Sequence, residues 1–232
     1  MTLGIADNLR RVHDRVAAAA VRSGRTPSDI TLIAVTKTWS SDVVQQVVDA
    51  GAVDLGENRV QEAQEKVDRV SGRVAWHLIG SLQRNKVKTA LSIFSLIHSV
   101  DSLRLAVEIG KQAALLGRDI PILIQVNTSG EVSKSGVSPE AALGLVGEIS
   151  GLRGLRIEGL MTIGPYVSDP EQVRPFFAAL RNIRERILDA HLEGVSMAAL
   201  SMGMTNDFEV AIEEGATMVR VGTAIFGSRR AR

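Results

Sequence analysis

Short apolar runs alternate with amphipathic segments along almost the whole chain. The runs recur about every 20 to 35 residues, which is the rhythm of βα units. About eight runs predict strands, over residues 31–36, 53–55, 74–79, 94–99, 120–127, 155–161, 195–200 and 217–221. Several of them are continuously apolar, as strands covered on both faces of a parallel sheet should be. The pattern therefore favours a parallel α/β fold over an antiparallel sandwich.

The segments between these runs have helical spacing. Leu9, Val12, Val16 and Ala20 predict a first helix within residues 2–22. Further helices are predicted over 102–116 and 171–190, the second with Asp169 and Pro170 as its cap and first turn. The pattern predicts a (β/α)8 barrel of the TIM type with an extra N-terminal helix, and an open doubly wound sheet is the alternative. Because no linker or low-complexity block interrupts the rhythm, residues 1–232 are expected to form a single domain.

Composition excludes several classes of protein. The chain holds no stretch near the roughly 18 apolar residues of a membrane span. Its formal net charge of +1 gives no long-range attraction to nucleic acid. Charged residues interrupt the N-terminal segment as they would not in a secretion signal, so a cytoplasmic protein is expected. The absence of cysteine removes disulfides and thiol chemistry, and the four histidines show no metal-binding spacing.

The barrel rule places candidate chemistry at the carboxyl ends of the strands. Lys37 directly follows the first predicted strand, at the mouth of an apolar barrel. Desolvation there would lower the pKa of the lysine and favour a Schiff base with an aldehyde. The alternative is a surface lysine that merely ends a strand.

The far end of the sequence offers a candidate phosphate site. Small and hydroxyl residues follow the last two predicted strands, in the segments 201–205 and 222–223. Such residues let backbone N–H groups approach a phosphate, although they are also common in ordinary turns. Together with Lys37 they favour a phosphorylated aldehyde as ligand, and pyridoxal phosphate is one. No two glycines are separated by a single residue, which excludes the G-x-G-x-x-G dinucleotide fingerprint.

Seven motifs in order along nearly the whole chain carry a family resemblance. They are AVTKT at 34–38, GENRVQE at 56–62, WHLIGSLQRNK at 76–86, QVNTSGEVSKSG at 125–136, GLM at 159–161, LSMGM at 200–204 and VRVGTAIFG at 219–227. The chain resembles the pyridoxal phosphate homeostasis proteins, which are relatives of the alanine racemase barrel domain. It departs from them at Arg59, where many relatives carry an aromatic residue, and at Ser81, where many carry proline.

The resemblance implies that pyridoxal phosphate is held as a Schiff base on Lys37. It implies that Arg220 faces the pyridine nitrogen of the cofactor. Because arginine stays protonated, it would keep the ring a weak electron sink. Asn58 and His77 lie in family motifs and are expected near the cofactor. The residues expected around the phosphate are Ser201, Gly203, Gly222 and Thr223, with the Met202 amide as a further candidate.

The resemblance also bears on activity. Alanine racemases use two bases, the Schiff-base lysine and a tyrosine from a separate C-terminal domain. That domain is not in this sequence, and Tyr166, the one tyrosine, belongs to the loop after the sixth predicted strand. Racemisation needs a proton-transferring group on each face of the substrate. We therefore expect a monomeric carrier that buffers pyridoxal phosphate and delivers it to apo-enzymes, with a one-base amino-acid racemase as the alternative and a Schiff-base aldolase as a third hypothesis.

Overall fold

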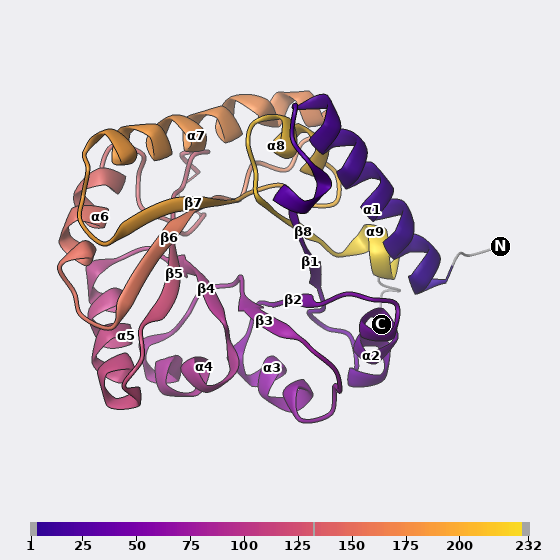
Figure 1. Cartoon of the computed structure of the whole chain (residues 1–232), viewed down its shortest axis with the longest axis horizontal. Helices are drawn as coiled ribbons and strands as arrows, with labels where there is room; N and C mark the ends of the chain where they lie inside the picture. The colour runs from indigo at the N-terminus through magenta and orange to yellow at the C-terminus, as the bar shows by residue number, and fades with distance from the viewer. Residues whose placement is uncertain (1–3, 132, 229–232) are drawn as a thin grey trace.

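A computed structural model describes residues 4–131 and 133–228 of the chain. In these residues eight parallel strands form a closed barrel in sequential order, and helices surround it (Figure 1). The strands are β1 (Thr31–Val35), β2 (Asp54–Glu57), β3 (Ala75–Leu78), β4 (Leu96–Val100), β5 (Ile120–Gln125), β6 (Leu155–Met161), β7 (Val195–Ser201) and β8 (Met218–Val221). The predicted (β/α)8 barrel is confirmed, and the open sheet is excluded because β1 pairs with β8.

The helices fill the connections between the strands. They are α1 (Ile5–Arg22), α2 (Ser41–Asp49), α3 (Val60–Val67), α4 (Val87–Ile93), α5 (Leu103–Leu116), α6 (Ala142–Ser150), α7 (Arg174–Asp189), α8 (Phe208–Glu213) and α9 (Thr223–Phe226), with short 3-10 turns η1 (Pro27–Asp29), η2 (Arg84–Lys86) and η3 (Pro170–Val173). The predicted cap is present, since Asp169 Oδ1 accepts a hydrogen bond from the Glu171 amide at 3.0 Å. The helix predicted over 171–190 is divided into η3 and α7. No helix in the described ranges combines the length and apolar character needed to cross a membrane.

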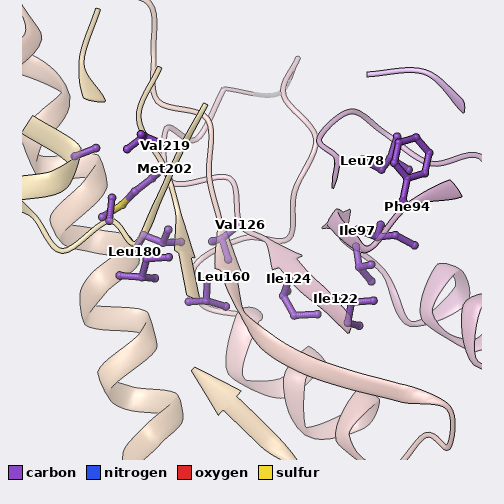
Figure 2. Packing of buried hydrophobic residues seen from close by; sticks show 14 of the residues in the cluster. Leu78, Phe94, Ile97, Ile122, Ile124, Val126, Leu160, Leu180, Met202 and Val219 are labelled. Atoms are coloured by element: carbon purple, nitrogen blue, oxygen red, sulfur yellow. The ribbon is translucent and has the colours of Figure 1, made fainter. Parts of the chain in front are cut away.

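Most of the apolar core lies between the barrel and its helices. Figure 2 shows Ile122 and Ile124 of β5, Leu160 of β6 and Leu180 of α7 among the buried side chains of this layer. Each of the four is fully buried. Alternate residues of each strand therefore anchor the helices, which leaves the others to fill the barrel interior.

The barrel interior contains an apolar layer and a polar layer. Leu96, Leu123, Met161 and Ala199 form a separate buried apolar cluster, with Met218 packed against it. Two positions further along β4, β7 and β8 stand the polar residues His98, Ser201 and Arg220, all of them buried. Because side chains two apart on a strand share a face, this polar layer lies nearer the carboxyl ends of the strands. It forms the base of the region where barrel chemistry is expected.

The extra helix α1 covers the place where the barrel closes. Figure 1 shows α1 beside α8 and α9, and both helices contact it. The side-chain amide of Asn8 donates a hydrogen bond from Nδ2 to the Ile225 carbonyl of α9 at 3.0 Å. Arg15 and Arg22 of α1 form ion pairs with Glu209 and Glu213 of α8. The first helix therefore supports the elements that follow β7 and β8.

Candidate functional site

A cavity of about 450 Å³ opens at the carboxyl ends of the strands. Its wall comes from the loops after β1, β2, β3, β6, β7 and β8 together with the strand ends themselves. The lining residues are Val35, Lys37, Trp39, Asn58, Ile79, Ile163, Pro165, Tyr166, Val167, Pro170, Val173, Met204, Thr205, Asn206, Asp207, Arg220, Gly222, Thr223 and Gly227. Apolar walls with a few convergent polar groups are typical of small-ligand sites, and the volume lies in their usual range.

Lys37 lines the cavity from the turn after β1. Both of its chain neighbours are fixed by the side chains of α3. Lys66 Nζ donates to the Thr36 carbonyl at 2.9 Å, and the Glu62 carboxylate accepts from the Thr38 amide. Thr38 has a positive φ of 68°, a conformation that a non-glycine residue adopts only where its surroundings require it. The backbone that carries Lys37 is thus held on both sides.

A buried ion cluster lies behind this turn. Lys66 Nζ contacts Glu57 Oε1 at 2.7 Å and Glu62 Oε1 at 2.9 Å, and the Thr36 hydroxyl donates to Glu57 Oε1 at 2.6 Å. Burial raises the pKa of Glu57, and the hydrogen bonds from Lys66 and Thr36 oppose that rise. The other carboxylate oxygen of Glu57 is buried without a hydrogen-bond partner among the described residues. Lys66 is therefore the cation that makes a buried Glu57 tolerable.

Arg220 of β8 presents a cation to the cavity from inside the barrel. Its Nη1 donates to Ser201 Oγ at 2.6 Å and its Nη2 to the Thr162 carbonyl at 2.7 Å. Burial lowers the pKa of Arg220 to about 10, with the charge of Asp207 acting in the opposite direction. The guanidinium therefore remains protonated at neutral pH.

The loops after β7 and β8 join at Thr205. Its hydroxyl accepts long hydrogen bonds from the Gly222 and Ala224 amides, at 3.3 and 3.4 Å. Gly203 allows this loop to pack closely: its φ is +91°, and an added Cβ would stand 2.5 Å from the Ala211 Cβ. This part of the wall offers hydroxyls and backbone N–H groups, which suit an anion.

Asn58 lines the cavity from the loop after β2. The loop after β3 crosses directly over its backbone, since a Cβ on Gly80 would lie 2.4 Å from the Asn58 carbonyl oxygen. Only glycine permits this approach, which fixes the main chain that carries Asn58.

The site residues predicted from sequence divide into two groups. Those that line the cavity are Lys37, Asn58, Arg220, Gly222 and Thr223. Those that do not line it are His77, Ser201, Met202 and Gly203.

Each residue of the second group has a partner inside the protein. His77 contacts Asp54 and His98, and Ser201 contacts His98 and Arg220. The Met202 amide donates to the Met218 carbonyl at 3.1 Å, so it is not open to a ligand. The Met202 side chain is buried in the outer core cluster that also contains Leu160 and Leu180 (Figure 2).

Several lining residues were not predicted. Trp39 stacks on Phe226 with ring centroids 5.6 Å apart, two positions after Lys37. Thr205 belongs to the predicted phosphate segment 201–205, although it was not singled out within that segment. Tyr166 and Ile163 enter through the loop after β6, whose course the sequence pattern does not specify.

Known proteins resemble this chain over nearly its whole length. The family described as "Alanine racemase, N-terminal domain" matches residues 5–230. A protein of Aquifex aeolicus named "Pyridoxal phosphate homeostasis protein" is 42% identical over 97% of this chain and 98% of its own. One of the same name from Escherichia coli K12 is 39% identical over 97% of each chain.

Solved structures also resemble this chain over nearly its whole length. A Bifidobacterium adolescentis protein of unknown function has a TM-score of 0.90 at 41% identity, covering 95% of this chain and 94% of its own. PipY of Synechococcus elongatus, solved with pyridoxal phosphate bound, has a TM-score of 0.81 at 34% identity, covering 96% and 100%. Alanine racemase of Clostridium difficile, at 16% identity and a TM-score of 0.76, shares the fold. The chain belongs to the pyridoxal phosphate homeostasis proteins, within the family of the alanine racemase N-terminal domain.

Proposed function

We propose that this protein binds pyridoxal phosphate reversibly through Lys37 and serves intracellular homeostasis of that cofactor. The observation that carries the proposal is the convergence of Lys37, Arg220 and the Gly222–Thr223 segment on one cavity. The names of the relatives and the pyridoxal phosphate bound to PipY support it.

The residues present fit this cofactor. Lys37 offers a primary amine, Arg220 a charged donor, and Thr205 with Thr223 hydroxyls beside backbone N–H groups. These groups match in kind the aldehyde, ring nitrogen and phosphate of the ligand. The cavity of about 450 Å³ is large enough for a ligand of this size.

Bound pyridoxal phosphate supplies an aldehyde that condenses reversibly with a primary amine, releasing water. Lys37 would supply that amine, and hydrolysis would free the lysine again. Arg220 would donate a hydrogen bond to the ring nitrogen, and its fixed charge would prevent it from accepting a proton there. Thr205, Gly222 and Thr223 would hold the phosphate, and Asn58 would contact the ligand from the side of β2. We leave His77, Ser201, Met202 and Gly203 out of this contact set.

A one-base amino-acid racemase is the second candidate. Tyr166 lines the cavity and is itself 90% exposed to solvent. Incorporation of solvent deuterium at the α-carbon of an added amino acid, abolished in Lys37→Ala, would favour the racemase over the carrier.

The proposal is tested on the purified protein by absorbance, borohydride reduction and peptide mapping. We expect a yellow protein in which reduction fixes the cofactor on Lys37, and a colourless Lys37→Ala variant. Lys88→Ala is the matched control, since Lys88 is exposed and does not line the cavity. A wild-type protein that gains no cofactor mass after reduction with added pyridoxal phosphate would exclude the proposal.

Four further properties belong to the proposal. We expect residues 1–232 to act as a single domain, as a monomer, in the cytoplasm, and in exchange with apo-enzymes that need the cofactor. Light scattering after size exclusion tests the monomer. Transfer from loaded protein to a pure apo-enzyme, in the presence of a scavenger for free aldehyde, tests direct delivery.

A further inference from the structure

A chain of four hydrogen bonds crosses the barrel interior from Asp54 to Arg220. His77 Nε2 lies 2.9 Å from Asp54 Oδ1, and His77 Nδ1 lies 3.0 Å from His98 Nε2. His98 Nδ1 then lies 2.9 Å from Ser201 Oγ, which accepts from Arg220 Nη1 at 2.6 Å. The chain joins β2, β3, β4, β7 and β8.

With both histidines neutral, the two ends of the chain fix the direction of every hydrogen bond. An ionised Asp54 only accepts, so His77 carries its proton on Nε2 and leaves Nδ1 as an acceptor. His98 must then donate from Nε2, which leaves its own Nδ1 to accept from the Ser201 hydroxyl. Ser201 Oγ in turn offers a lone pair to Arg220, which can only donate. The pattern contains two neutral histidines, each with its proton on Nε2.

Burial supports a neutral His98 in this chain. His98 is fully buried, and burial lowers its pKa well below the usual value. Asp54 has the greatest contact with water, with 24% of its side chain exposed against 6% for His77. The charged groups that face the chain are Asp54 at one end and, at the other, Arg220 with Asp207 near it.

We infer that Asp54, His77, His98 and Ser201 act as positioning residues that hold the Arg220 guanidinium in one orientation at the base of the cavity. This inference rests on the proposed function, because the orientation of Arg220 matters where it meets the ring nitrogen of the ligand. Asp54 acts through three intervening side chains, from the amino-terminal end of β2.

The first test reads the chain without the cofactor. Nitrogen-15 NMR of the histidine rings in the cofactor-free protein should show directly bonded protons on Nε2 of His77 and His98, and none on Nδ1. Asp54→Asn lets residue 54 donate, which permits the reversed chain with protons on Nδ1. We expect the second pattern to appear in the variant beside the first, because the asparagine amide both donates and accepts. Wild-type rings with their protons on Nδ1 would overturn the inference.

The second test reads the effect on the ligand. In Asp54→Asn the Kd for pyridoxal phosphate should rise about 5-fold, the equivalent of one ordinary hydrogen bond. The ratio of the two absorption bands of the bound cofactor should change as well, which loss of stability alone would not cause. Glu158→Gln is the matched control. Glu158 is an acidic residue of β6 that pairs with Arg156 and does not belong to the hydrogen-bond chain.

The outcomes separate the two proposals. The positioning role would be overturned if Asp54→Asn had the same Kd and band ratio as the wild-type protein while Lys37 was still labelled. That result would leave the proposed function intact. Absence of labelling in the wild-type protein would overturn the proposed function, while the NMR measurement would still decide the direction of the chain.

Discussion

At the scale of single residues, Lys66 helps to hold the turn that carries Lys37. It is the cation of a buried cluster with two carboxylates, and it also holds the Thr36 carbonyl. Lys66→Met leaves Glu57 buried without a cation, and loss of one partner of a buried pair costs about 3–5 kcal/mol. We expect a loss of that size in the free energy of unfolding, measured by urea denaturation, and a weaker Kd for pyridoxal phosphate.

The conservative variant separates charge from packing. Lys66→Arg keeps the cation and should recover part of both losses, while Lys88→Met, at an exposed site, should change neither. If Lys66→Met unfolded at the same urea concentration as the wild-type protein, the cluster would not stabilise the turn.

The sequence could predict Lys37 but not the cluster that holds it. A lysine directly after a buried strand stands out because the barrel rule gives it a place. Lys66 stands in an amphipathic segment, where a charged residue is normally expected to face water. Glu62 and Lys66, four apart, suggest an ordinary surface pair. Only the tertiary structure brings Glu57 beneath them.

At the scale of elements, α1 supports one wall of the cavity through α9. The Asn8 amide donates to the Ile225 carbonyl, and α9 begins at Thr223, which lines the cavity. Asn8→Ala should lower the free energy of unfolding by about 1 kcal/mol, the net value of one hydrogen bond. We also expect a weaker Kd for pyridoxal phosphate, because the segment expected to hold the phosphate loses its support.

Arg10→Ala provides the comparison for this prediction. Arg10 is on the same helix but is exposed, and its ion pair with Asp7 lies within α1. Such a surface pair contributes little. A lowered stability in Asn8→Ala with an unchanged Kd would show that α1 stabilises the barrel without supporting the site.

The strand predictions show which element boundaries a sequence can fix. The run predicted over 155–161 coincides with β6, because apolar residues stand at both ends of that strand. The run predicted over 53–55 is displaced, since β2 extends over Gly56 and Glu57 while Val53 is exposed. A Cβ at Gly56 would stand 2.9 Å from the Ile33 Cγ2 atom. Gly56 completes the strand because space is limited there, and Glu57 because Lys66 pairs with it. The pattern of apolar residues shows neither cause.

At the scale of the whole molecule, the buried His98 links folding stability to pH. Its pKa is lowered well below the usual value, chiefly by burial, so the folded protein does not bind a proton where the unfolded chain does. Stability should therefore fall as pH decreases below about 6.5, with His98 contributing about 1.4 kcal/mol per pH unit. His98→Gln, which retains a donor and an acceptor, should show a shallower decline between pH 6.5 and 5.5 in urea unfolding. Parallel declines in the two proteins would contradict this assignment.

Closure of the barrel also determines when the cavity can form during synthesis of the chain. Lys37 follows β1, whereas Thr205, Gly222 and Thr223 come from the end of the chain, and pairing of β1 with β8 brings them together. A growing chain thus exposes Lys37 long before the opposite wall exists. Until β8 leaves the ribosome, that lysine has no cavity around it and differs little from any other amine of the nascent chain. On the proposed function, selective capture of a reactive aldehyde would begin only when the last strand has closed the ring.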